Sequence, residues 1–126
     1  MLSYFRIKLL IAAVLATSLA AAAAEKNTVN VKGYVLDSAC AFTKNLSKPI
    51  SAECALACAK AGSPLVILAD NGYIYWPISD ATPATGQNER LMNFAGQKVE
   101  VTGKVFVRGG SRAIVIEKID AAPAAH

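Results

Sequence analysis

Hydrophobic and polar residues alternate along several short stretches of the chain, which is the pattern of half-buried β-strands. The clearest stretch is 99–107, where valine or glycine occupies every second position. A Gly-Gly pair follows at 109–110, and residues 113–119 are again rich in apolar side chains, so we expect a β-hairpin here. Residues 28–36 alternate in the same way and predict the first strand of the fold.

Two shorter apolar runs, 65–68 and 73–76, lie on either side of Asn71-Gly72. Asn-Gly between two such runs predicts a tight hairpin, because both residues tolerate positive φ angles. Gly33, in the middle of the first predicted strand, suggests a bulge or a sharp bend of the kind that curves small barrels.

Two stretches between the strands predict helices. Residues 52–61 follow Ser51, whose hydroxyl can cap a helix N-terminus, and they precede Gly62, a common helix stop. A second, shorter helix is expected within 88–94, with Asn88 as its cap. An isolated helix as short as the first is marginal in water, so packing or its cysteines must stabilise it.

The predicted order is strand, helix, strand, strand, short helix, strand, strand, and residues 42–50 are expected to form a loop. Five short strands with a helix between the third and the fourth are typical of the OB-fold, a small Greek-key barrel. We therefore expect a mainly β protein: an OB-like five-stranded barrel with an additional helix inserted between strands 1 and 2. An open α+β sheet is the alternative.

The first residues have the features of a secretory signal peptide. Arg6 and Lys8 precede an uncharged apolar run that ends in small residues, so we predict a cleaved leader at 1–24. A single domain would then span 25–120, with a flexible tail at 121–126. We expect a periplasmic or secreted protein that contacts a membrane only through the leader before cleavage.

Charge and composition exclude several function classes. Removing the leader takes two of the 13 Lys and Arg residues and leaves 11 against 9 Asp and Glu, so the formal net charge falls from +4 to +2. This surplus is too small to predict nucleic-acid binding. The sequence offers a single histidine and no glycine-rich phosphate loop, so we expect no enzyme, with thiol–disulfide exchange as the one activity left open.

All three cysteines, Cys40, Cys54 and Cys58, lie close together in the sequence. Exported thiols tend to form disulfides, and an odd number leaves one without an internal partner. Cys54 and Cys58 are four residues apart on the predicted helix, where a mutual disulfide would distort the backbone. We expect a disulfide from Cys40 to one of them, worth roughly 3 kcal/mol, which would pin the helix to the barrel. The sequence leaves both pairings open, so the unpaired cysteine would be either Cys54 or Cys58.

Other functions of the three cysteines remain open. Cys40, Cys54 and Cys58 together could hold a soft metal ion, copper ahead of zinc, although the sequence requires no cofactor. Thiol–disulfide exchange is the further alternative. The aromatic residues Tyr73, Tyr75 and Trp76 are candidates for a ligand groove. The expected role is that of an exported binding or accessory domain, whose partner would be a protein or small ligand in the periplasm.

Three segments carry a resemblance to a known group of proteins: 33–40 (GYVLDSAC), 54–66 (CALACAKAGSPLV) and 94–105 (FAGQKVEVTGKV). Together they resemble small exported bacterial proteins with an OB-like barrel and a Cys plus CxxxC pattern. The resemblance covers most of the predicted domain and implies the fold and the export, but no activity. Relatives are expected to have a histidine just before the cysteine pair, where this chain has Ser51-Ala52-Glu53. That departure weakens a metal site that needs an imidazole.

Overall fold

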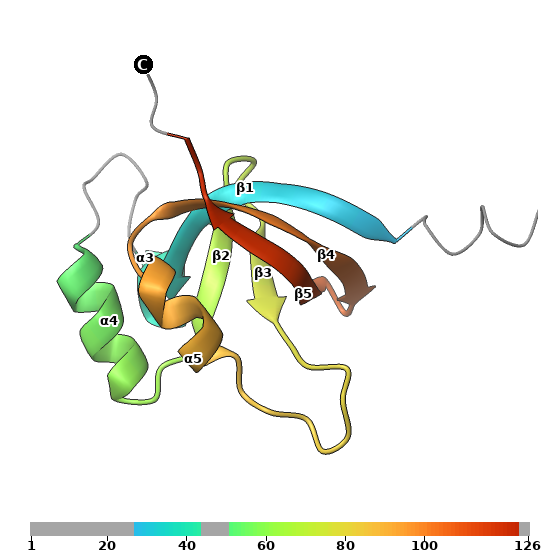
Figure 1. The fold of residues 1–126 in the computed structure, drawn as a ribbon, viewed down its shortest axis with the longest axis horizontal. Coiled ribbons are helices and arrows are strands. Elements are labelled where there is room, and N and C mark those ends of the chain that lie inside the picture. The colour runs from blue at the N-terminus through green and yellow to red at the C-terminus, as the bar shows by residue number, and fades with distance from the viewer. Residues whose placement is uncertain (1–26, 44–50, 124–126) are drawn as a thin grey trace, which may run out of the picture.

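The computed structural model describes residues 27–43 and 51–123. Five strands close into a barrel (Figure 1). They are β1 (Thr28–Asp37), β2 (Leu65–Ala69), β3 (Ile74–Pro77), β4 (Lys98–Arg108) and β5 (Ser111–Ala121).

The strand order around the barrel is β1-β2-β3-β5-β4, and β4 pairs with β1 to close it. Neighbouring strands are antiparallel except β3 and β5, which are parallel. The predicted OB-like Greek-key barrel is therefore confirmed, and the alternative of an open α+β sheet is wrong because the sheet has no free edge. The predicted leader at 1–24 lies outside the described residues.

The described helices lie in the connections between strands. They are α3 (Ser38–Thr43), α4 (Ala52–Lys60) and α5 (Asn88–Leu91), which continues into the 3-10 turn η1 (Met92–Phe94). The helix expected between strands 1 and 2 is present as α4. The prediction of a loop at 42–50 missed α3, which begins directly after β1 and ends at Thr43. The remaining residues of the predicted loop, 44–50, lie outside the described part.

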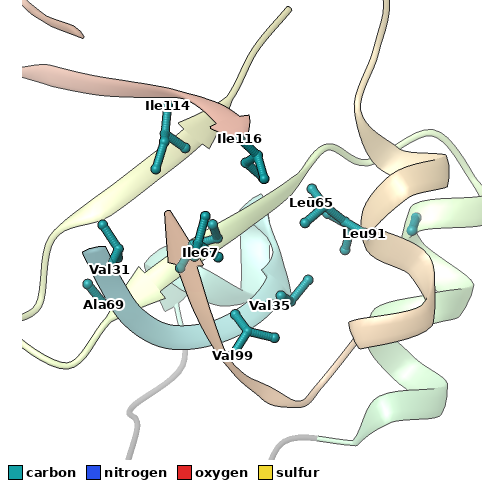
Figure 2. Close-up of a cluster of buried hydrophobic side chains, with 11 residues drawn as sticks. Val31, Val35, Leu65, Ile67, Ala69, Leu91, Val99, Ile114 and Ile116 are labelled. Carbon is teal, nitrogen blue, oxygen red and sulfur yellow. The ribbon is translucent and has the colours of Figure 1, made fainter. Parts of the chain in front are cut away.

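Figure 2 shows the core inside the barrel, where side chains from β1, β2, β4 and β5 meet. Its strand members are fully or almost fully buried: Val31, Val35, Leu65, Ile67, Ala69, Val99, Val101, Ile114 and Ile116. Tyr75 of β3 is partly buried and packs against this core. Leu91 of α5 is fully buried against this cluster, so α5 and η1 cover one end of the barrel. Ala59 packs α4 against the same core.

β2 is buried on both faces, with all five of its residues inaccessible. Leu65, Ile67 and Ala69 point into the barrel, and Val66 and Leu68 belong to a second apolar cluster that includes Ala41 of α3. Strands buried on both faces are nearly continuously apolar, and Leu-Val-Ile-Leu-Ala fits that rule. α3 therefore covers the outer face of β2.

Two glycine positions shape the barrel. Gly109 and Gly110 both have positive φ, which the tight turn between β4 and β5 requires. Gly33 pairs with Ala69 on β2 and with Val99 on β4. A Cβ at position 33 would lie 2.7 Å from the Cα of Ala69, so only glycine allows this close approach of β1 and β2.

Asn88 has a different role from the predicted one. Gln87 takes the cap position of α5, and the Asn88 side chain joins α4 to β2 instead. Its Oδ1 accepts a hydrogen bond from the Leu65 amide at 2.8 Å, while Nδ2 donates to the carbonyl oxygens of Ser63 at 2.8 Å and Ala59 at 3.3 Å. This amide satisfies backbone groups at the end of α4 and the start of β2.

Candidate functional site

The candidate site is built around Asp37, the last residue of β1. Its side chain is 1 % exposed, which is rare for a carboxylate. Oδ2 accepts a hydrogen bond from the Cys40 amide at 3.3 Å and one from the Ser63 hydroxyl at 3.4 Å. Oδ1 is buried and has no hydrogen-bond partner among the described residues. An unpaired buried carboxylate oxygen is costly, so it marks Asp37 as a candidate functional group.

Asp37 also explains why α3 forms. An aspartate just before a helix can accept a hydrogen bond from an orphan amide of the first turn. The Cys40 amide provides that donor. The same carboxylate thus caps α3 and brings the Cys40 side chain, which is partly buried, to the Asp37 site.

The other two cysteines are held by α4. Ser51 caps this helix as predicted, its hydroxyl accepting a hydrogen bond from the Cys54 amide at 3.2 Å. Cys54 and Cys58 are four residues apart and lie on one face of α4. Cys54 is exposed, whereas Cys58 is partly buried.

The prediction of a disulfide is wrong. Cys40, Cys54 and Cys58 are all free thiols. Cys54 and Cys58 lie 4.4 Å apart, and an S–S bond would need about 2.05 Å. No covalent link from Cys40 pins α4 to the barrel; packing of Ala55 and Ala59 holds the helix instead.

The prediction of a copper or zinc site at Cys40, Cys54 and Cys58 is also wrong. Within residues 27–43 and 51–123, no group of three or more His, Cys, Asp or Glu side chains is arranged to hold a metal ion. Cys40 is carried by α3 and the other two cysteines by α4, and the acidic group beside them is Asp37. With neither a disulfide nor a metal-binding group among the described residues, the binding or accessory role built on this cluster has no support.

Asp37 sets the electrostatics of the cysteines. Hydrogen bonding to Asp37, then burial and the negative charge of Asp37, raise the pKa of the Cys40 thiol from 9.0 to about 11. Burial and, after it, the Asp37 charge raise the pKa of Cys58 as well. Cys54 contributes to both shifts, so the three thiols interact through one site. At neutral pH, Cys40 and Cys58 therefore hold their protons.

The three aromatic residues predicted to line a groove have separate surroundings. Tyr75 packs against the barrel core. Tyr73 is exposed, and the Arg112 guanidinium lies over its ring at 3.6 Å from the centroid. Trp76 packs at the edge of the second apolar cluster, where its ring lies 6.4 Å from that of Phe42. The alternation of strand side chains places Tyr73 and Tyr75 on one face and Trp76 on the other, so the sequence pattern already separates Trp76 from the two tyrosines.

None of the helices in the described part of the chain is long and apolar enough to cross a membrane. Comparison of the chain with protein-family models, with curated proteins and with solved structures gave no match. The resemblance to small exported OB-like proteins therefore stays a prediction.

Proposed function

We propose that the protein carries out thiol–disulfide exchange with small disulfides, using Cys54 and Cys58. One observation carries the proposal: two unbonded thiols lie 4.4 Å apart on one face of α4, in the neighbourhood of the buried Asp37 carboxylate. Unlike a disulfide staple or a metal site, this chemistry needs thiols that are free in the resting protein. The proposed setting is the oxidising space outside the cytoplasm, in keeping with the predicted leader.

Exposure and pKa assign the roles. The raised pKa of Cys40 and of Cys58 disfavours their thiolates, and the thiolate is the attacking species in exchange. Cys54 is the exposed thiol of the three and the one that a soluble disulfide can reach. We therefore assign the attack to Cys54 and the second, resolving step to Cys58.

The reaction has two steps. The Cys54 thiolate attacks a disulfide RS–SR, forming a mixed Cys54–S–S–R disulfide and releasing RS⁻, which takes up a proton. Cys58 then loses its proton and attacks the Cys54 sulfur, which releases the second RSH and leaves a Cys54–Cys58 disulfide. The small disulfide is reduced to two thiols, and the protein dithiol is oxidised.

Closing that disulfide requires the first turn of α4 to open. α4 has nine residues, so it is of a length that is marginal without packing. Cys54 lies in its first turn, which the Ser51 hydroxyl caps. Losing one cap of this kind costs about 1 kcal/mol, a small barrier to the movement of Cys54 toward Cys58.

Asp37 is the proposed proton acceptor for the second step. The negative charge of Asp37 raises the pKa of Cys58, so the thiol keeps its proton until it attacks. The Oδ1 atom of Asp37 has no hydrogen-bond partner among the described residues and can accept that proton. A positioned general base of this kind contributes typically 10²–10⁴-fold to a proton transfer. Asp37→Asn should therefore slow resolution of the mixed disulfide and leave the first step by Cys54 unchanged.

The test is reaction of the reduced protein with glutathione disulfide at neutral pH, followed by intact mass. The wild type should lose two hydrogen atoms, Cys58→Ser should accumulate one glutathione adduct on Cys54, and Cys54→Ser should react far more slowly. Cys40→Ser is the matched control and should behave as the wild type. Equal rates for Cys54→Ser and wild type, or a wild type that stays reduced, would overturn the proposal.

A further inference from the structure

A depression on the outer barrel surface lies apart from the cysteines. It has a volume of about 380 Å³ and is lined by Trp76, Phe106, Arg108, Ser111, Arg112 and Ala113. Strand pairing explains its shape: Ala113 of β5 pairs with Trp76 of β3 on one side and with Phe106 of β4 on the other. Ile114 is fully buried inside the barrel, so the Ala113 side chain points outward.

This row places a small residue between two aromatic ones. Neighbouring strands lie about 4.8 Å apart, so the backbones that carry Trp76 and Phe106 are separated by roughly 10 Å. Ala113 forms a low floor between them. Phe106 is 49 % exposed although it is aromatic, so its ring is available for contact with a ligand. The spacing suits one flat ring between two aromatic walls.

Charge favours an anionic group on that ring. Among the residues that the structure describes, two arginines and no carboxylate line the depression. The ion pairs found in the described part of the chain all use lysines, so they leave Arg108 and Arg112 without a carboxylate partner there. Arg112 stacks on Tyr73, whereas Arg108 stands beside Ser111 at the end of the hairpin. A guanidinium beside a hydroxyl suits a carboxylate.

We propose that this depression binds a small molecule in which a flat ring carries a carboxylate. The ring would lie over Ala113 between Trp76 and Phe106, and the carboxylate would meet Arg108 and Ser111. The volume lies at the small end of the range of about 300–1,000 Å³ for ligand sites, which fits a single ring with a short acid chain. The site shares no residue with the thiol cluster, so it does not depend on the proposed exchange reaction.

The fluorescence of Trp76 provides a direct assay, because it is the single tryptophan of the chain. The probe is 3-phenylpropionate, with 3-phenylpropionamide as its uncharged counterpart. The acid should change the emission of Trp76 saturably and bind about fivefold more tightly than the amide, the upper end for an exposed ion pair. Higher salt should reduce the difference in affinity between the acid and the amide.

Three variants separate the contributions. Arg108→Gln should bind acid and amide equally, Phe106→Ala should weaken both, and Lys104→Gln, an exposed change on the same strand, should match the wild type. Circular dichroism checks that each variant keeps its barrel. The proposal is overturned if the wild type does not distinguish acid from amide, if it shows no saturable change, or if folded Phe106→Ala binds unchanged.

Discussion

Replacing Asp37 with asparagine removes one negative charge from the thiol cluster and keeps the size of the side chain. Asp37 raises the pKa of Cys40 first through a hydrogen bond and also through its charge, and burial adds to the shift from 9.0 to about 11. Two pKa units correspond to about 100-fold less thiolate at a given pH below both values. Burial persists in the variant, so we expect Asp37→Asn to raise the Cys40 thiolate fraction by about tenfold.

The assay is alkylation of Cys40 by iodoacetamide, whose rate follows the thiolate fraction. A Cys54→Ser/Cys58→Ser background leaves Cys40 as the single thiol, and the rate is measured across alkaline pH with and without Asp37→Asn. Asp70→Asn, a change of the same type at an exposed carboxylate, is the control. If Asp37→Asn does not lower the pH midpoint of the alkylation rate, the coupling between Asp37 and Cys40 is refuted.

Three further predictions concern stability, each measured by urea unfolding. Because the folded pKa of Cys40 lies above its unfolded value of 9.0, the native state holds a proton that the unfolded state has lost between about pH 9 and about pH 11. Stability should therefore fall as pH rises through this window, by about 1 kcal/mol after allowance for solvent screening, and Cys40→Ser should flatten that part of the profile. Gly33→Ala should lower stability by about 1–3 kcal/mol, because the added Cβ would meet the β2 backbone. Gly86→Ala is the control: its Cβ meets nothing within 4 Å in the described part of the chain, so stability should change by less than about 0.5 kcal/mol. Asn88→Ala should cost about 1–3 kcal/mol because it leaves the Leu65 amide without its acceptor; a cost no larger than that of Asn71→Ala, at an exposed turn, would contradict this role.

The barrel was predictable because its sequence signals are local. Alternation in 28–36 and 99–107, the Asn71-Gly72 turn and the Gly-Gly pair each specify one strand or one hairpin. Their order then leaves few topologies, and the observed strand order is the one expected for an OB-like barrel. The Ser51 cap was predictable for the same reason, since its hydrogen bond spans three residues.

The site was harder to predict because it depends on contacts between distant residues. Spacing places Cys54 and Cys58 on one helix face, but it does not determine whether Cys40 reaches bonding distance. The buried Asp37 carboxylate contacts the Cys40 amide of α3 and the hydroxyl of Ser63, which is 26 residues away, whereas the sequence favours a turn residue at that position. The sequence around Asn88 predicts a helix cap, because its true hydrogen-bond partners lie 23 to 29 residues away and leave no local signal.

α3 links the sulfur chemistry to an optical signal. Cys40 and Phe42 are two residues apart on this single short helix, and the Phe42 ring faces Trp76 at a centroid distance of 6.4 Å. Any reaction at Cys40 that shifts α3 would change the environment of the indole. The chain thus contains its own spectroscopic reporter, whose emission can follow events on the helix without an added dye.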